Sequence, residues 1–488
     1  MSAGPSLVQM AVVLSVYVVV VIAVGALAAR RSARSPEEYF LAGRGLGTFV
    51  LFMALFGTNA TSFVLVAIPG LAYHEGVGVF GLNAAIVALG TPLTFVVIGV
   101  PAWRMGRRLG ALTPAELFRK RFDSRAVGIV LFAFFTLYTL PYMVIAVKGA
   151  AVTLESITQG AVPTWAGGLG VIVVALVYTS LGGMRATAWT NVLQGSLFLL
   201  FMVLVFFLVP RSMGGLGETM RALEEQRPEL LRIVPEGKYA PRAWASWGLV
   251  ISLTVIAFPH MLVRLLAARS QNALKSIVRL YPVALVALWL PAVLLGVWGA
   301  LEFPGLVGKE SDSIYSLMIA RHLPSWLGAL GFLAVVAAVM STLDAQLLTL
   351  GSMLVRDVVD PFRRGDASQG DVRSARVFTL ALAGLVYFLS RVWGQSLFDI
   401  ASVAFSGYTT LTPMLFLSLW WRRFNAEGAI ASILLGNVTL WLGEKGIFET
   451  HGFLPVFPAL VVAVVSGVVV SLLSRPCEAE ITERAMGR

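Results

Sequence analysis

Charged side chains are scarce in this chain, and their scarcity excludes most water-soluble folds. Asp, Glu, Lys and Arg together make up 13% of the 488 residues, whereas about 25% is usual for a soluble domain. Hydrophobic residues make up 58% of the chain, and the mean hydropathy is +0.83. We therefore expect a protein that is largely embedded in membrane lipid.

Cysteine is almost absent, and so are the local signatures of catalysis. The single cysteine, Cys477, excludes an intrachain disulfide and a metal cluster built on several cysteines. The sequence holds no GxSxG or HExxH motif, no phosphate-binding glycine loop and no dinucleotide fingerprint. We therefore expect a protein that is not an enzyme.

The net charge of +11 would suggest a nucleic-acid partner in a soluble protein. Here the basic residues lie in short loops between apolar runs, so membrane topology explains them and no nucleic-acid partner is expected. Apolar runs of about 20 residues predict thirteen membrane spans. The expected spans are 7–29, 48–72, 80–102, 127–157, 164–182, 188–210, 244–267, 278–301, 325–355, 375–391, 396–420, 427–444 and 455–474.

The basic residues also predict the orientation of the chain. With the N-terminus outside, most of the 37 Lys and Arg residues fall on the inner side, including Arg31, Arg34 and Arg264. The positive-inside rule then places the C-terminal tail in the cytoplasm. The first apolar run lacks a basic n-region, which indicates a span rather than a cleaved signal peptide. The expected location is the cell (inner) membrane, with many crossings.

The second expected span contains polar residues and helix breakers at membrane depth. Its sequence, LFMALFGTNATSFVLVAIPGLAYHE (51–75), holds a polar centre and then Pro69–Gly70. Because backbone groups in hydrocarbon must be satisfied within the protein, such a span indicates a broken helix whose free carbonyls line a cavity. The alternative is an unbroken Ser/Thr-rich helix that hydrogen-bonds a neighbouring helix.

Two halves of the chain share a pattern in opposite orientation. Spans two to six match spans seven to eleven, with breaks expected near Pro69–Gly70 and near Pro259 and with a long fourth and ninth span. Matching interruptions indicate an inverted-repeat transporter with its site at the midplane. The expected organisation is 1–47 for the first span and inner loop, 48–210 for the first repeat, 211–243 for an outer amphipathic loop, 244–420 for the second repeat, 421–474 for two further spans and 475–488 for a cytoplasmic tail.

One helix face of the ninth span could bind a small cation. Ala338, Ser341 and Thr342 stand at i, i+3 and i+4, so two hydroxyls and one carbonyl share that face. The carbonyls of Gly57 and Ala60 in the broken span could complete a set of oxygen ligands. In the alternative, Ser341 and Thr342 only bond the preceding helical turn.

Three of the ionisable residues inside expected spans are candidates for a functional role, because charge is costly at membrane depth. Asp344 serves either as a structural ion-pair partner or in coupling and gating. Lys148 either reaches the interface or an acid, or offers a counter-charge to an anionic substrate. His260 either packs or donates to a substrate oxygen. The candidate substrate-binding residues are Asn59, Thr61, Phe63, Tyr142 (with packing as its alternative), Lys148 and His260.

Four segments resemble sodium:solute symporters, in order along nearly the whole chain. They are SPEEYFLAGRGLG (35–47), GGMRATAWTNVLQG (182–195), MSTLDAQLL (340–348) and PMLFLSLWWRRFNAEGAIAS (413–432). The resemblance implies an all-α membrane fold of the leucine-transporter type, with a five-plus-five inverted repeat, one helix before it and two after. It also implies Na⁺-driven uptake, with Na⁺ held by Gly57, Ala60, Ala338, Ser341 and Thr342.

Two positions depart from the family pattern. Asn59 stands where many members have an aspartate, and Asn191, a coupling or gating candidate, stands where members with a second sodium site have one. We therefore expect one Na⁺ per cycle. Within the family, AIPGLAYHEG, the surroundings of Lys148 and FPHMLVRLLAAR resemble the monocarboxylate and pantothenate branch.

The resulting hypothesis is an importer of a small organic anion, driven by Na⁺ and working by alternating access. The expected substrate is a monocarboxylate such as lactate, pyruvate, acetate or propionate, and a monomer would suffice. Three alternatives stay open. They are proton-coupled carboxylate transport through Asp344, Na⁺ symport of pantothenate or an amino acid, and a ligand sensor that kept the transporter body.

Overall fold

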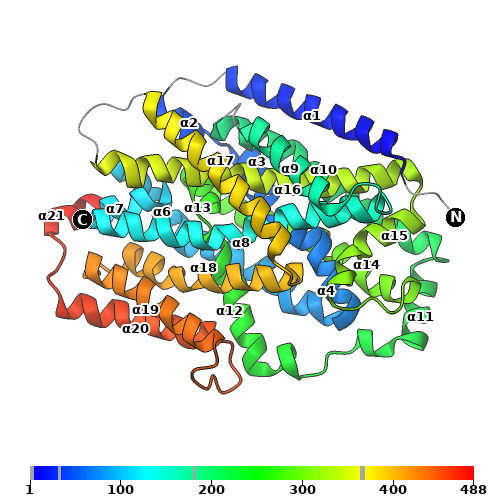
Figure 1. Ribbon diagram of the computed structural model, residues 1–488. Helices are drawn as coiled ribbons and strands as arrows, with labels where there is room; N and C mark the ends of the chain where they lie inside the picture. Colours follow the sequence, from blue (N-terminus) through cyan, green and yellow to red (C-terminus); the bar gives the residue numbers. More distant parts are fainter. Residues whose placement is uncertain (1–4, 31–34, 180–182, 363–368, 488) are drawn as a thin grey trace.

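The computed structural model describes residues 5–30, 35–179, 183–362 and 369–487, and these form a bundle of helices (Figure 1). Three residues named above lie outside the described residues: Arg31 and Arg34 of the basic residues, and Gly182 of the motif 182–195. The α-helices are α1 (Leu7–Arg30), α2 (Pro36–Leu41), α3 (Thr48–Asn59), α4 (Ile68–Glu75), α5 (Ala85–Thr94), α6 (Val100–Leu109), α7 (Pro114–Phe122), α8 (Arg125–Ile157), α9 (Thr164–Thr179), α10 (Met184–Ser212), α11 (Leu216–Gln226), α12 (Pro241–Ala257), α13 (Pro259–Leu266), α14 (Gln271–Glu302), α15 (Ile314–His322), α16 (Ser325–Met353), α17 (Gln369–Val392), α18 (Leu397–Trp420), α19 (Ala426–Glu444), α20 (Val456–Leu473) and α21 (Ala479–Met486).

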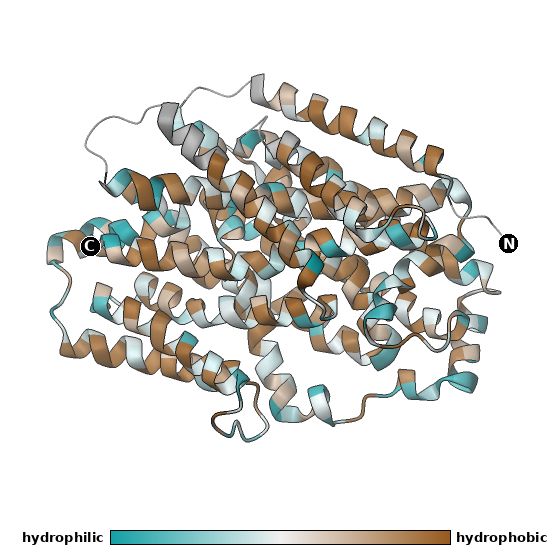
Figure 2. Cartoon of the chain, in the orientation of Figure 1, coloured by the Kyte–Doolittle hydropathy of each residue, from teal (hydrophilic) through white to brown (hydrophobic). Residues whose placement is uncertain are grey.

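The expected all-α membrane architecture is confirmed. Within the described ranges, nine helices are long and apolar enough to cross a membrane, and two bent helix pairs raise that number to eleven. Two shorter apolar helices, Thr164–Leu176 and Val377–Val392, lie at the fifth and tenth expected spans. Hydrophobic residues cover most of the helix lengths, whereas hydrophilic residues gather towards helix ends and connections (Figure 2). The boundaries of the two repeats stay a prediction.

The first broken span is interrupted earlier than the sequence suggested. Helix α3 ends at Asn59, and the helix resumes at an angle of 54° with a π-helical segment, Phe63–Ala67, that leads into α4. The expected break near Pro69–Gly70 is therefore wrong, since Pro69 lies in the first turn of α4. The π-helical turn before Pro69 accommodates its missing N–H, so this proline does not end the helix.

Local hydrogen bonds explain why the chain leaves the helix after Asn59. Ala60 is extended, with φ −85° and ψ 107°. Thr61 Oγ1 accepts from the Phe63 N–H at 3.2 Å, and Ser62 Oγ donates to the Ile145 carbonyl of α8 at 2.8 Å. Short polar side chains thus compete with the helical hydrogen-bond ladder and stabilise the interruption.

The second broken span is interrupted where the sequence predicted. Helices α12 and α13 meet at an angle of 53°, and Phe258 between them is extended, with φ −65° and ψ 121°. The residue before a proline is sterically kept out of the helical region, so Pro259 starts a new helix rather than continuing α12.

The long helices α8 and α16 lie at the centre of the bundle, and α1, α19 and α20 lie at its edges (Figure 1). Nearly every residue of α16 from Leu327 onwards is buried. Helix α16 packs against α3, α8, α10 and α13, so it touches both broken spans. The start of α1 and the C-terminal helix α21 lie at opposite ends of the bundle, as an odd number of crossings requires (Figure 1).

The two broken spans are joined at the end that the basic residues assign to the cytoplasm. Leu46, just before α3, forms a parallel bridge with Ala268, just after α13. Arg44 is buried and donates to the carbonyls of Leu266 at 3.4 Å and of Ala111 at 2.8 Å. This end of the bundle is therefore closed by contacts between the two broken spans.

The motif 35–47 and the motif 182–195 contact each other at the same end. Arg185 Nε lies 2.5 Å from Glu38 Oε1, and its Nη2 donates to the Ala42 carbonyl at 3.0 Å. Ser35 caps α2 by accepting from the Glu38 N–H. These two stretches thus form one structural unit around the entrance to α3.

Candidate cation and substrate site

Four oxygens of the expected cation site lie together where α3 ends beside the middle of α16. Ser341 Oγ donates to the Gly57 carbonyl at 2.7 Å and to the Ala338 carbonyl at 2.8 Å as alternative acceptors. Thr342 Oγ1 lies 3.1 Å from the Ala338 carbonyl. We call the oxygens of Gly57, Ala338, Ser341 and Thr342 the oxygen cluster.

A fifth oxygen comes from a residue that the sequence reasoning missed. Thr342 Oγ1 lies 3.0 Å from the Thr58 carbonyl, which joins the cluster. Ala60 lies at the wall of the neighbouring cavity, and its N–H donates to the Phe56 carbonyl at 3.1 Å. A helix that is about to end leaves its last four carbonyls without helical partners, which is the signal that could have included Thr58.

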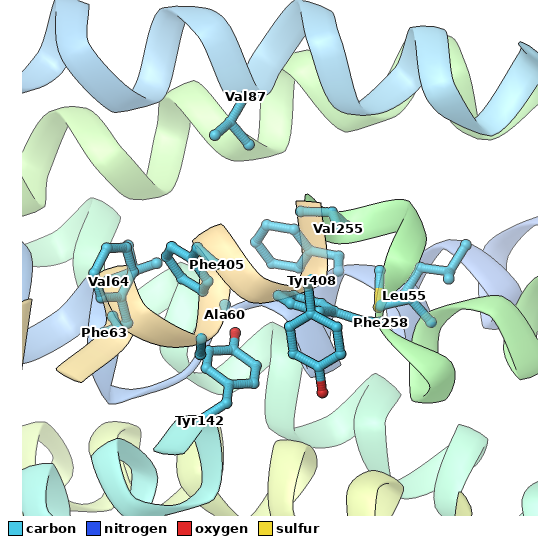
Figure 3. Close-up of a cluster of buried hydrophobic side chains, with 14 of the residues drawn as sticks. Leu55, Ala60, Phe63, Val64, Val87, Tyr142, Val255, Phe258, Phe405 and Tyr408 are labelled. Atoms are coloured by element: carbon cyan, nitrogen blue, oxygen red, sulfur yellow. The ribbon is translucent and has the colours of Figure 1, made fainter. Parts of the chain in front are cut away.

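A cavity lies beside the oxygen cluster, between the two helix breaks. The space between its lining residues amounts to about 430 Å³, a figure that includes space open to solvent. Figure 3 shows Ala60 and Phe63 from the first break, Phe258 from the second, and Phe405 around this region. The full lining is Asn59, Ala60, Phe63, Val64, Val87, Tyr142, Ile251, Thr254, Val255, Phe258, Leu285, Leu288, Trp289 and Phe405.

Aromatic rings dominate the cavity, and its polar groups are neutral. Phe63 packs edge-on against Phe405, with ring centroids 5.0 Å apart, and against Trp289 at 6.0 Å. Tyr142 stacks on Phe258 at 4.9 Å. None of the fourteen lining residues is charged. Pockets of this kind, apolar with a few polar groups, are typical small-molecule sites.

Asn59, Tyr142 and Thr254 line the cavity and can orient a ligand by hydrogen bonds. The Tyr142 hydroxyl points towards Ala60 in Figure 3 and donates to the Asn59 carbonyl at 3.3 Å. Thr254 Oγ1 donates to the Phe405 carbonyl at 3.2 Å. Asn59, Phe63 and Tyr142 of the expected substrate residues thus line the cavity, whereas Thr61 is buried in the break itself.

Lys148 lies away from this cavity. Its ammonium donates to the carbonyls of Trp393 at 2.9 Å and of Gln395 at 2.6 Å, in the connection between α17 and α18. Of the two interpretations of Lys148, this position favours the lysine that reaches the interface over the counter-charge to a substrate.

A buried carboxylate lies near Lys148, in the connection between α14 and α15. Asp312 is 5% exposed and accepts from the Leu397 N–H at 3.3 Å. Burial raises the pKa of the Asp312 carboxyl to about 6, against the opposing effects of the Leu397 N–H and the Lys148 ammonium.

His260 and Asp344 are both fully buried, and neither lines the cavity. The His260 ring stacks on Phe258, with centroids 5.1 Å apart, and on Tyr142 at 6.1 Å, and it does not line the cavity. Asp344 follows Ser341 by three residues on α16 and is fully buried. The roles of His260 in binding and of Asp344 in coupling stay predictions.

Asn191, on α10, contacts both the first broken span and a buried arginine. Its side-chain amide has one atom 3.0 Å from Arg264 Nη2 and 2.9 Å from Thr58 Oγ1. A guanidinium can only donate, so the amide atom that faces it is the oxygen. The amide nitrogen then donates to Gln194 Oε1 at 2.9 Å and to the Thr187 carbonyl at 3.1 Å.

Arg264, which the charge distribution counted among the basic residues of the inner side, is buried within the protein rather than solvated. It lies on α13, is 1% exposed, and its Nη1 donates to the His260 carbonyl at 3.0 Å. The positive-inside rule counts charges near span ends and cannot distinguish a solvated arginine from one that a half-helix buries.

Two interrupted helices that enclose a small-molecule cavity, with an oxygen cluster at one break, define the architecture of a secondary active transporter. A family model described as "Sodium:solute symporter family" matches residues 39–436. The chain belongs to the sodium:solute symporter family, and Na⁺ is therefore its coupling ion.

Curated relatives and solved structures agree with this assignment. The chain is 26% identical to the sodium/proline symporter of Escherichia coli (strain K12), over 97% of this chain and 95% of that protein. It is 27% identical to the sodium/pantothenate symporter of the same strain, over 92% and 93%. A Na⁺-coupled sialic acid symporter in a substrate-bound outward-open state superimposes with a TM-score of 0.79 at 18% identity, covering 96% of this chain and 99% of that one.

A second solved structure extends the likeness of fold. Mhp1, a nucleobase-cation-symport-1 family transporter in a closed conformation, gives a TM-score of 0.60 at 14% identity over 91% of this chain and 97% of that one. The chain thus has the leucine-transporter type of fold. It is a Na⁺-coupled solute symporter of the cell membrane.

Proposed function

We propose that one Na⁺ binds at the oxygen cluster and drives import of a small organic carboxylate by alternating access. The single observation that carries this proposal is the position of the oxygen cluster and the aromatic cavity at the same helix break. The Gly57, Thr58 and Ala338 carbonyls and the Ser341 and Thr342 hydroxyls are the ligands, with the Ala60 carbonyl a further candidate. Neutral hard oxygens in this number suit a small monovalent cation.

The substrate class follows from the cavity and from what the relatives carry. Their names give proline and pantothenate, and both of these solutes have a carboxylate, as lactate, pyruvate, acetate and propionate do. Because the lining is neutral and aromatic, we propose a compact solute whose apolar part contacts Phe63, Phe258 and Phe405. The preferred substrate is a monocarboxylate.

A carboxylate in this cavity would meet neutral donors and the positive end of a helix. Helix α13 starts at Pro259 beside the cavity, and the partial positive charge of a helix N-terminus attracts anions. The Asn59 amide and the hydroxyls of Tyr142 and Thr254 can donate to the same group. The Na⁺ supplies the full positive charge that the side chains lack.

Alternating access requires one end of the bundle to open while the other is closed. The contacts of Arg44 and the Leu46–Ala268 bridge close the end at which α3 begins. With the N-terminus outside and the C-terminal tail in the cytoplasm, this closed end is the cytoplasmic one. Import would then require separation of these contacts after Na⁺ and substrate have bound.

An amino acid zwitterion such as proline is the second candidate, because a cavity without charged residues does not favour a net anion. The two candidates differ in the charge that they carry. One Na⁺ with a monoanion moves no net charge, whereas one Na⁺ with a zwitterion moves one charge, worth about 2.3 kcal/mol per 100 mV.

Uptake into proteoliposomes tests this proposal. Labelled pyruvate, lactate, pantothenate and proline are each offered under an inward Na⁺ gradient and, separately, under a proton gradient. We expect Na⁺-dependent uptake of a monocarboxylate that an inside-negative potential does not accelerate. Uptake of proline alone, accelerated by the potential, would select the zwitterion, and binding of a solute without uptake would indicate a sensor.

A further inference from the structure

Arg264 is a fully buried guanidinium at the centre of the bundle, a position that needs several hydrogen-bond acceptors. Two of them are the His260 carbonyl of its own helix, at 3.0 Å from Nη1, and the Asn191 amide oxygen of α10, at 3.0 Å from Nη2. Arg264 therefore connects α13, the inner half of the second broken span, to α10.

The contacts continue from Asn191 to the oxygen cluster. The same amide oxygen accepts from Thr58 Oγ1 at 2.9 Å, and the carbonyl of Thr58 lies 3.0 Å from Thr342 Oγ1. A Cβ added to Gly57 would lie 3.1 Å from the Asn191 carbonyl, so α3 and α10 touch at this point. A continuous series of buried polar contacts thus runs from α13 to the cation ligands.

We propose that Arg264 is a positioning residue for the Na⁺ site. Through Asn191 it fixes the side chain of Thr58, and with it the Thr58 carbonyl that faces Thr342. The proposal rests on the Na⁺ site assigned under the proposed function and adds the element that links it to the second broken span. Movement of α13 away from α10 breaks the contact to Asn191 and weakens Na⁺ binding, so opening of the cytoplasmic end favours release of Na⁺.

The contact geometry separates this role from one of simple packing. If Arg264 acts through Thr58, then removing the guanidinium or the Thr58 hydroxyl weakens Na⁺ binding to the same extent. Removing both groups then weakens it little further. If Arg264 only stabilises the fold, loss of the Thr58 hydroxyl and loss of the guanidinium affect Na⁺ binding independently. A double-mutant cycle measured on Na⁺ affinity therefore decides between the two.

The experiment measures binding of ²²Na⁺ to the purified full-length protein, so it needs no identified substrate. Thr58→Val removes one hydroxyl at nearly constant shape, and Arg264→Met removes the guanidinium at similar length. We expect each to raise the Na⁺ Kd about tenfold, as the loss of one buried hydrogen bond would. The double variant should also lie near tenfold rather than a hundredfold.

Matched controls test whether the effect is specific to this position. Thr94→Val removes a buried hydroxyl that donates to Thr91 within its own helix, and Arg121→Met removes a buried guanidinium of α7 that donates to Ser418. Both should leave the Na⁺ Kd within twofold of the wild type. Arg264→Lys, which keeps one donor group, should bind Na⁺ with an intermediate Kd.

Three results would overturn the proposal. They are an unchanged Kd in Thr58→Val, an unchanged Kd in Arg264→Lys together with Arg264→Met, and a hundredfold loss in the double variant. If Arg264→Met does not fold, Thr58→Val and Arg264→Lys still decide the question. Ser341→Ala separates this proposal from the Na⁺ site itself, because loss of binding there with no effect at Thr58 and Arg264 rejects only the positioning role.

Discussion

Substitution of Asp312 by asparagine should remove one component of the pH dependence of stability. Asp312 lies in the connection between α14 and α15, buried under the start of α18, where its carboxylate accepts from the Leu397 N–H. Burial raises its pKa from an ordinary value of 3.8 to about 6, since the charged form loses hydration. Asparagine has nearly the same shape and stays neutral at every pH.

The sign of the effect follows from the direction of the shift. The folded protein holds the proton of Asp312 more tightly than the unfolded chain, so protonation stabilises the fold. This contribution is fully present below the unfolded pKa near 3.8 and is lost as the pH rises through about 6. The two pKa values correspond to about 3 kcal/mol between the extremes, at 1.36 kcal/mol per unit.

The assay is thermal unfolding of purified Asp312→Asn and wild-type protein from pH 4.5 to 7.5, followed by tryptophan fluorescence. Between pH 4.5 and 7.5 about 2 kcal/mol of this contribution is lost. With an unfolding entropy of about 2.1 cal/mol/K per residue, that loss corresponds to roughly 2 °C for a chain of this length. We expect the variant to gain stability over the wild type as the pH rises. A difference that stays constant over this range would refute the reasoning. Asp123→Asn, at an exposed position with φ +49°, serves as the control.

Two further substitutions test the helix break and the cavity. Gly149→Ala would place a Cβ 2.4 Å from Ser62 Cβ, so it should displace the first break and raise the Na⁺ Kd at least tenfold in ²²Na⁺ binding, whereas Gly170→Ala, with no atom within 4 Å, should not. Tyr142→Phe removes a hydroxyl beside the cavity that donates to Asn59. It should raise the KM for substrate uptake several-fold and leave the Na⁺ Kd unchanged, and the opposite pattern would count against the cavity.

The membrane architecture could be predicted because each span is set by local composition. Within the described residues, nine long apolar helices, two bent helix pairs and two shorter apolar helices lie at the expected spans. The break at Pro259 follows from the steric effect of proline on the residue before it. These features depend on the nearby sequence and on the thickness of the bilayer. They need no knowledge of tertiary contacts.

The position of the first break could not be predicted in the same way. Pro69–Gly70 is the stronger breaker by composition, yet a π-helical turn accommodates Pro69, and the helix instead ends at Asn59. The bond from Ser62 to the Ile145 carbonyl of α8 helps to fix this choice. Local propensity cannot reveal a contact between residues that lie 83 positions apart in the sequence.

The candidate site could likewise be predicted only in part. The spacing of Ala338, Ser341 and Thr342 on one helix face predicted a set of oxygens that the structure brings together with Gly57. The contact to Thr58 depends on the register between α3 and α16, which the sequence of neither helix specifies.

Buried charges were the hardest features to place from the sequence. The sequence counts Arg264 among the charges of the inner side, whereas the structure buries it on α13 beside Asn191. The sequence places Lys148 at membrane depth, whereas in the structure its ammonium reaches two loop carbonyls. In both cases the structure supplies a partner from a part of the chain remote in sequence, Asn191 for Arg264 and the connection between α17 and α18 for Lys148.

The central claim is that the oxygen cluster is the Na⁺ site, and ²²Na⁺ binding to a double variant tests it most directly. Ser341→Ala with Thr342→Ala removes both hydroxyls. Ser352→Ala removes a hydroxyl of the same helix that donates to the Leu348 carbonyl. We predict that the double variant loses saturable Na⁺ binding in the range in which the wild type and Ser352→Ala retain it. Equal Na⁺ affinity in all three proteins would contradict the account.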